Sequence, residues 1–175
     1  TRFIISKEVS DKIQPFLSEI DLIVGTEEEI QICSGIQIRN NSKTLADCLL
    51  AIRKYSEATI VVKKGESGCE VFTFDLNKPI CARSFNIEVL NVLGAGDAFL
   101  SGFLRGWIRK EELKTCALYG NACGAIVVTR HGCSPASPSF EEIEFFIQNF
   151  DKVNDLAHAP HMEKLHTRTK LGHHL

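Results

Sequence analysis

Four consecutive residues, Gly94-Ala95-Gly96-Asp97, stand directly before a strongly apolar helical pattern. Glycines let the backbone approach a ligand closely, and the free amides at the start of a helix bind anions such as phosphate. A carboxylate beside that anion repels it, so Asp97 makes chemical sense there as a base that takes a proton from an attacking hydroxyl. An ordinary helix start explains the same residues equally well, because aspartate is common in the first turn of helices.

Two further patterns have both a structural and a chemical interpretation. Thr26 and Glu29 have the spacing of a capping box, in which each side chain bonds the backbone of the other residue. Gly65 and Gly68 have the spacing of a tight turn between two strands. The lysines at 63 and 64 end the first of these strands, where they could reach a phosphate, although lysines at such positions are more often simply solvated.

The composition is that of an ordinary globular protein with one core. The chain has 175 residues, of which 44% are hydrophobic, and its net charge is −2. This charge gives no electrostatic argument for a nucleic-acid or membrane partner. No apolar run reaches the roughly 18 residues that a membrane-spanning helix needs.

The seven cysteines favour a reducing compartment. Their number is odd, no CxxC pair occurs, and several stand inside apolar runs, where a free thiol behaves as a small hydrophobe. We therefore expect reduced thiols rather than disulfides or metal ligands, and a cytoplasmic location.

The elements that must position these residues alternate between strands and helices. Helices are predicted over 5–20 with an interruption at Pro15, from Thr26 to Gly35, over 42–57, after Gly96, over 113–128 and from Ser139, which forms a capping box with Glu142. Strands are predicted over 21–25, 58–64, 69–74 and 80–85. The alternation predicts an α/β fold with a mostly parallel sheet, and the last two strands predict an antiparallel edge. Small residues in the 113–128 helix predict a close approach by another element.

The segment around Asp97, GAGDAFLSGFL, resembles the signature of the ribokinase-like (PfkB-type) sugar kinases. The resemblance implies a ribokinase-like fold, in which helices cover both faces of a mostly parallel sheet in three α/β/α layers. It also implies that Asp97 is the catalytic base, and that the amides of Gly94, Ala95 and Gly96 form the anion hole for the transferred phosphoryl group. The cofactors that it implies are ATP and Mg²⁺.

Three flanking segments resemble the same family and imply further roles. Glu29 matches the glutamate that helps to organise Mg²⁺ with phosphate. Gly65 and Gly68 match the turn that lines the nucleotide phosphates. Asn121 matches a position near adenine and Gly132 matches the glycine of the loop that follows, although a local hydrogen bond is an equal explanation for Asn121.

The resemblance does not carry over a potassium site. In many family members an aspartate and the residue two places later help to bind a monovalent cation. Asn91 and Leu93 stand at those two positions here.

Within the family, VLNVLGAGDAFLSGFLRGW and NACGAIVVTRHGC resemble most the kinases of 5-dehydro-2-deoxygluconate, which act in inositol breakdown. Fructokinases and 2-keto-3-deoxygluconate kinases are the alternatives. The implied partners are ATP and a small sugar or sugar acid with a primary hydroxyl. A nucleotide-binding or structural module without turnover is the alternative from another class.

We expect residues 1–150 to be the C-terminal, nucleotide-binding half of a kinase domain and 151–175 to be a linker or tail. The chain begins without methionine, which indicates a piece of a longer protein. In the family the sugar contacts come mainly from the other half, so we expect this fragment alone to have little or no kinase activity. An incomplete sheet would expose a strand edge, which favours a homo-oligomer.

Overall fold

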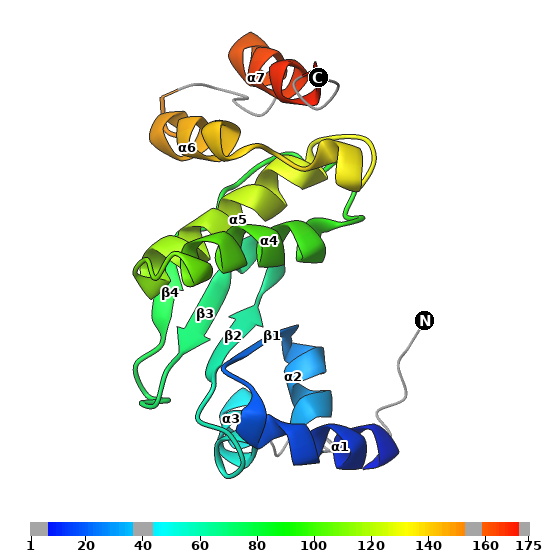
Figure 1. Cartoon of the computed structure of the whole chain (residues 1–175), viewed down its shortest axis with the longest axis vertical. Coiled ribbons are helices and arrows are strands. Elements are labelled where there is room, and N and C mark those ends of the chain that lie inside the picture. The colour runs from blue at the N-terminus through cyan, green and yellow to red at the C-terminus, as the bar shows by residue number, and fades with distance from the viewer. Residues whose placement is uncertain (1–6, 37–43, 153–158, 172–175) are drawn as a thin grey trace. The chain divides into compact units, whose positions relative to one another are not determined.

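The computed structural model describes residues 7–36, 44–152 and 159–171. The chain forms two compact units, Thr1–Cys81 and Ala82–Leu175, which are described separately (Figure 1).

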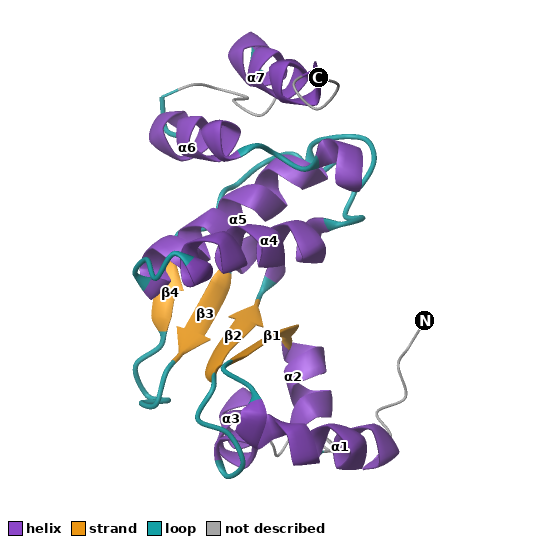
Figure 2. Cartoon of the chain, viewed as in Figure 1, coloured by secondary structure: helices purple, strands orange, loops and turns teal. Residues whose placement is uncertain are grey.

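Unit 1 is built on a four-stranded sheet with the order β1-β2-β3-β4 (Figure 2). Its elements are α1 (Lys7–Ile13), the 3₁₀ helix η1 (Gln14–Glu19), β1 (Leu22–Thr26), α2 (Glu27–Ser34), α3 (Leu45–Arg53), β2 (Thr59–Lys63), the 3₁₀ turn η2 (Gly65–Ser67), β3 (Cys69–Phe72) and β4 (Ile80–Ala82). Strands β1 and β2 are parallel, whereas β2 and β3 are antiparallel. The α/β class and the antiparallel edge are confirmed, but the described sheet is mixed rather than mostly parallel.

The core of unit 1 lies where α2 and α3 pack against the sheet. Ile60, Val62 and Phe72 of the sheet form one apolar cluster with Leu49 and Ile52 of α3. Burial of such side chains contributes about 1.5–3 kcal/mol each. Strand β2 is buried along its three central residues, as its continuous apolar sequence predicts.

The helix signals of unit 1 act largely as the sequence predicts. Thr26 caps α2 with a complete capping box, and Gly35 ends the helix with φ 70°, in the left-handed region that favours glycine. The expected helix over 5–20 is shorter. Its α-helical part ends at Ile13, and Pro15 stands near the start of η1, because proline is tolerated in a first turn but not in a helix interior.

Unit 2 is helical in its described part. Its elements are α4 (Ala95–Ile108), α5 (Leu113–Val128), the 3₁₀ turn η3 (Ser134–Ala136), α6 (Phe140–Asn149) and α7 (Pro160–Leu171). Helices α4 and α5 approach closely through glycines, as the small residues predicted. A Cβ on Gly102 would stand 2.6 Å from Tyr119 O, and one on Gly120 would stand 2.9 Å from the Phe99 ring. The region over 87–92 contains no strand.

The C-terminal region differs from the expected linker or tail. Helix α7 forms there, and Met162 is fully buried in the apolar cluster of unit 2 with Phe146 of α6. The sequence shows only a weak helical pattern there, because Met162 is the single buried side chain among the described side chains of α7. Residues 153–158 lie outside the described part.

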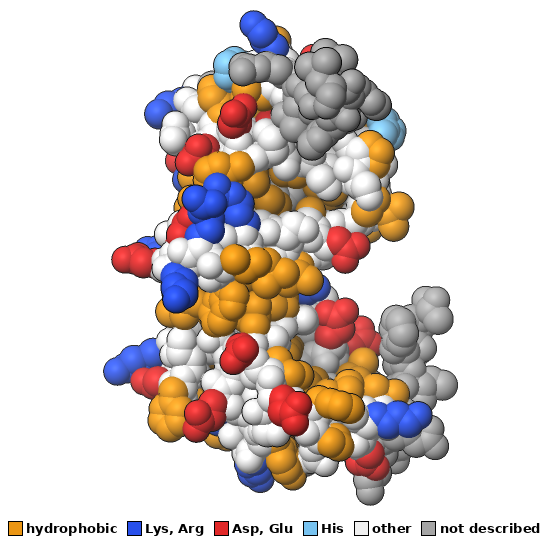
Figure 3. Space-filling view, in the orientation of Figure 1, with side chains coloured by type: hydrophobic (Ala, Val, Ile, Leu, Met, Phe, Trp, Pro, Cys, Tyr) orange, Lys and Arg blue, Asp and Glu red, His pale blue; other side chains and the backbone are white. Residues whose placement is uncertain are grey.

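The seven cysteines are free thiols, as predicted. Burial raises the pKa of the Cys123 thiol to about 12, which keeps it protonated. Some large apolar side chains lie at the surface (Figure 3), among them Val92 and Leu93 before α4. Among the described helices, none is long and apolar enough to cross a membrane.

Candidate functional site

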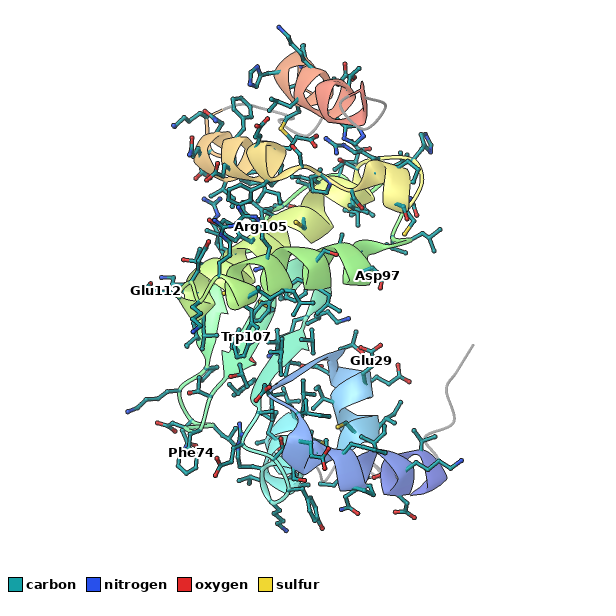
Figure 4. The ribbon with its side chains drawn as sticks, in the orientation of Figure 1. Glu29, Phe74, Asp97, Arg105, Trp107 and Glu112 are labelled. Atoms are coloured by element: carbon teal, nitrogen blue, oxygen red, sulfur yellow. The ribbon has the colours of Figure 1, made fainter. Side chains whose placement is uncertain are left out.

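Glu29 is held at the first turn of α2 by the capping box (Figure 4). The Thr26 N–H donates to Glu29 Oε2 at 2.7 Å, and the Glu29 N–H donates to Thr26 Oγ1 at 3.2 Å. The Thr26 backbone bond, with the nearby Lys63 ammonium as a smaller contribution, lowers the pKa of Glu29, against a partial effect of burial. The carboxylate is therefore ionised, oriented by the Thr26 N–H and still accessible to a ligand.

Gly25 leaves the room that this carboxylate needs. A Cβ at Gly25 would stand 3.0 Å from Glu29 Cβ and 3.3 Å from Glu29 Oε2. A side chain at this position would therefore crowd Glu29 and force it to shift by a few tenths of an ångström.

Two lysines stand at the end of β2, beside the start of α2. In the parallel register Lys63 lies opposite Thr26, so its ammonium comes within 3.6 Å of Glu29 Oε2. Lys64 lies 2.7 Å from Glu70 Oε2 and 3.8 Å from Glu27 Oε1. The carboxyl ends of two parallel strands thus carry both acidic and basic groups, at the edge of a sheet where α/β proteins bind ligands.

The turn after β2 has the two glycines at positions that require them. Gly65 has φ 57° and Gly68 has φ 82°. The turn is closed by Lys64 N–H to Gly68 O at 2.8 Å and Gly68 N–H to Gly65 O at 3.0 Å. A Cβ on Gly65 would meet nothing within 4 Å, so the backbone there is open to an approaching ligand.

In unit 2, Asp97 stands in the first turn of α4 with an exposed side chain (Figure 4). Gly94 precedes the helix with φ 82°, and a Cβ there would collide with Cys133 Sγ. The Ala95 N–H bonds Val92 O at 3.3 Å, and the first helical bond runs from Ala98 N–H to Gly94 O at 2.9 Å. The amides of Gly96 and Asp97 therefore have no partner within the helix and are suited to bind an anion.

The Asn91 side chain makes two hydrogen bonds that hold the segment before this turn. Its Oδ1 accepts the Leu93 N–H at 2.7 Å, and its Nδ2 donates to Arg130 O at 3.2 Å. These two bonds hold Asn91 in a hydrogen-bonded turn, and its side-chain amide brings no negative charge to this position.

A buried ion pair, which no local pattern in the sequence predicts, also contacts this segment. Arg130 Nη2 lies 2.6 Å from Glu142 Oε1, and Glu142 is 0% exposed. Arg130 Nη1 also donates to Ala136 O at 3.1 Å and lies 3.2 Å from His166 Nδ1 of α7. Because Arg130 O receives Asn91, this pair supports the loop that begins α4. The capping box of Ser139 and Glu142 was predicted, but the burial of Glu142 depends on tertiary packing.

The other two predicted nucleotide-binding residues also lie in unit 2. Asn121 is buried in α5, and its Nδ2 donates to Arg83 O at 2.9 Å. This bond is structural but not the local one that the sequence offered as an alternative, because Arg83 lies 38 residues away along the chain. The adenine contact stays a prediction. Gly132 has φ 91° in the loop after α5.

The structure therefore groups the predicted residues into two sets. Glu29, Gly65 and Gly68 belong to unit 1, and the turn before α4 belongs to unit 2 with Asn121 and Gly132.

The surroundings of the Glu29 carboxylate fit a magnesium ion whose other ligands are phosphates and waters. No group of three or more His, Cys, Asp or Glu side chains in the described residues could form a metal cage. Mg²⁺ in phosphate-transfer sites needs only one or two carboxylates, with phosphates and waters as its other ligands. Glu29 supplies one such carboxylate, and the Lys63 ammonium already occupies a cation position beside it.

Solved structures of similar fold include two sugar kinases with bound nucleotide. A putative ribokinase II from E. coli, in complex with ATP and Mg²⁺, is 25% identical with a TM-score of 0.68, over 82% of this chain and 46% of that one. A fructokinase from Vibrio cholerae, in a form with fructose, ADP and calcium, is 25% identical with a TM-score of 0.67, over 80% of this chain and 45% of that one. The ribokinase-like fold is thereby confirmed.

Among curated proteins, a 5-dehydro-2-deoxygluconokinase of Listeria innocua is 33% identical over 133 residues. The match covers 76% of this chain but 39% of that protein, so the chain spans well under half the length of this relative. The pattern that defines the pfkB family carbohydrate kinases matches residues 3–139. Since this match covers most of the chain and agrees with the fold, the chain belongs to the pfkB family of carbohydrate kinases.

Proposed function

We propose that this chain supplies the nucleotide-binding and catalytic part of an ATP-dependent sugar kinase. The observation that carries the proposal is the start of α4, where Asp97 stands beside amides that have no helical partner. An anion site and a base side by side suit the transfer of a phosphoryl group to a hydroxyl.

In the proposed reaction Asp97 takes the proton from a primary hydroxyl of the sugar. The oxygen attacks the γ-phosphorus of ATP in line, the bond to the β-phosphate oxygen breaks, and ADP leaves. The amides of Gly96 and Asp97 stabilise the transferring charge, whereas the Ala95 amide, which the family resemblance implied for the anion hole, is bonded to Val92 O. Glu29 holds Mg²⁺, which neutralises phosphate charge when it is bound. The turn of Gly65 and Gly68 lines the phosphates, with open backbone at Gly65, and Asn121 and Gly132 border the adenine.

The proposed substrate is 5-dehydro-2-deoxygluconate. The name of the relative at 33% identity supports it. The fructokinase of similar fold keeps fructose as the second candidate, and 2-keto-3-deoxygluconate is the third.

The test is ATP consumption by the full polypeptide that carries these residues, with each of the three sugars, beside its Asp97→Asn variant. We expect one sugar to drive turnover, and the variant to lose about 10²–10⁴-fold in kcat because it has no base. MgATP affinity, measured by calorimetry, should stay close to that of the parent protein.

Two outcomes would contradict the proposal in different ways. If no sugar drives turnover while MgATP binds, the chain is a nucleotide-binding module. If Asp97→Asn turns over as fast as the parent, another group is the base.

A further inference from the structure

Lys63 and Glu29 form an ion pair whose two members have very different surroundings. The Lys63 side chain is 21% exposed and Glu29 is 60% exposed, and the ammonium lies 3.6 Å from Glu29 Oε2. That separation is longer than a hydrogen bond to an ammonium, so the contact is electrostatic. Oε2 also accepts the Thr26 N–H at 2.7 Å, which fixes the carboxylate whether or not the lysine stays.

An ion pair of this kind is easily exchanged. Pairs with an exposed partner contribute only about 0–1 kcal/mol, because water and salt screen them. A divalent ion at Glu29 would repel the Lys63 ammonium and remove its partner. Since lysine has a flexible four-carbon stem, the freed ammonium can reach another anion nearby.

The surroundings of Lys63 favour a phosphate as that anion. The residue ends β2 just before the turn from Gly65 to Gly68, in which the backbone is open at Gly65. The first turn of α2 carries Glu27, Glu28 and Glu29, which repel a nucleotide phosphate unless a cation intervenes.

We propose that Lys63 is an exchangeable nucleotide-binding residue, which neutralises Glu29 in the free protein and turns to the ATP phosphates when Mg²⁺ takes the carboxylate. This proposal rests on the proposed function, because it needs ATP and Mg²⁺ at this edge of the sheet. Binding of metal and nucleotide then becomes cooperative, because a metal at Glu29 frees Lys63 for the phosphates and a nucleotide at Lys63 frees Glu29 for the metal.

Lys64 provides a matched control at the adjacent position. Its ammonium lies between two carboxylates, 2.7 Å from Glu70 and 3.8 Å from Glu27. Neither of these partners is Glu29, so a metal at Glu29 does not release Lys64. The side chains at 63 and 64 have the same charge and length, and similar exposure of 21% and 26%.

The experiment is calorimetric titration of the full polypeptide with ATP, with and without MgCl₂. We expect Lys63→Met to weaken MgATP binding at least about tenfold, which is about 1.4 kcal/mol, because the variant loses a charge-assisted hydrogen bond to phosphate. Lys63→Arg should recover most of the loss. Lys64→Met should change the affinity by less than about twofold, as expected for a surface ion pair.

Glu29→Gln separates this role from a structural one. Without its carboxylate partner Lys63 is free in the absence of metal, so the variant should bind metal-free ATP more tightly than the parent and respond less to MgCl₂. In the double variant Lys63→Met/Glu29→Gln that gain should disappear, because Lys63 carries it.

Each failure has a distinct meaning. If the parent binds MgATP and Lys63→Met binds it equally well, or Lys64→Met loses as much, Lys63 has no special role. If the double variant keeps the gain in metal-free affinity, removal of negative charge explains it without Lys63. If the parent itself does not bind MgATP, the proposed function fails, and this inference fails with it.

Discussion

The two units each hold an arginine or lysine against a glutamate, and the two pairs differ in burial. In unit 1 the pair of Lys63 and Glu29 is separated by 3.6 Å, and the carboxylate is 60% exposed. In unit 2 the pair of Arg130 and Glu142 is separated by 2.6 Å, and the carboxylate is 0% exposed. Both glutamates also stand at position N3 of a helix and complete its capping box, so local structure does not explain the difference.

The difference shows how burial decides what an ion pair does. An exposed pair is weak and can exchange partners with a ligand, whereas a buried pair becomes costly to break once one charge would stand alone. Arg130 also bonds Ala136 O, and its own carbonyl receives Asn91. The buried pair therefore maintains the loop before α4, and the exposed pair stays available for ligand binding.

The largest expected effect comes from breaking the buried pair. Glu142→Ala should lower the free energy of unfolding by about 3–5 kcal/mol, because it leaves the Arg130 charge buried without its partner. Glu142→Gln keeps an acceptor for the cap and should lose less. Urea unfolding measures both variants.

A surface pair in the same unit gives the control for that comparison. Arg83 and Asp151 form two hydrogen bonds of 2.7 and 2.9 Å, but both side chains are exposed. Asp151→Asn should shift the unfolding midpoint far less than Glu142→Ala. An equal shift would mean that burial does not separate the two kinds of pair.

An intermediate effect is expected when the exposed pair is displaced without removal of either charge. Gly25→Ala places a Cβ 3.0 Å from Glu29 Cβ and 3.3 Å from Glu29 Oε2, so the Glu29 side chain must shift by a few tenths of an ångström. The weakened cap should cost up to about 1 kcal/mol, measured by thermal unfolding, and MgATP binding should weaken.

Gly124→Ala is the matched control, because its added Cβ meets only ordinary contacts at 3.6 and 3.9 Å within unit 2. Alanine is also the better helix former, so this variant should be at least as stable as the parent. If Gly25→Ala keeps both the parent stability and the parent affinity, Glu29 does not depend on the space at Gly25.

The sequence predicted the parts of the site that depend on local spacing. Both capping boxes, the turn glycines and the start of α4 depend on residues within a few positions of one another, and the structure has them all. The contact of Lys63 with Glu29 depends on the parallel register that sets Lys63 opposite Thr26, which no local pattern encodes. Helix α7 was missed for a related reason, because the burial of Met162 comes from packing against unit 2 and not from a repeating apolar face.

The smallest expected effect is the pH dependence of the exposed pair. The Thr26 N–H and the Lys63 ammonium hold the pKa of Glu29 below its ordinary 4.5. The ionised group therefore stabilises the fold fully above about pH 4.5, and this contribution is lost as pH falls through the lower pKa of the folded state. Solvent screening keeps the contribution under about 1 kcal/mol. The difference in unfolding free energy between the parent and Glu29→Gln should thus be largest near neutral pH and should shrink in acid. A difference that stays the same size in acid would mean that the charge of Glu29 does not stabilise the fold.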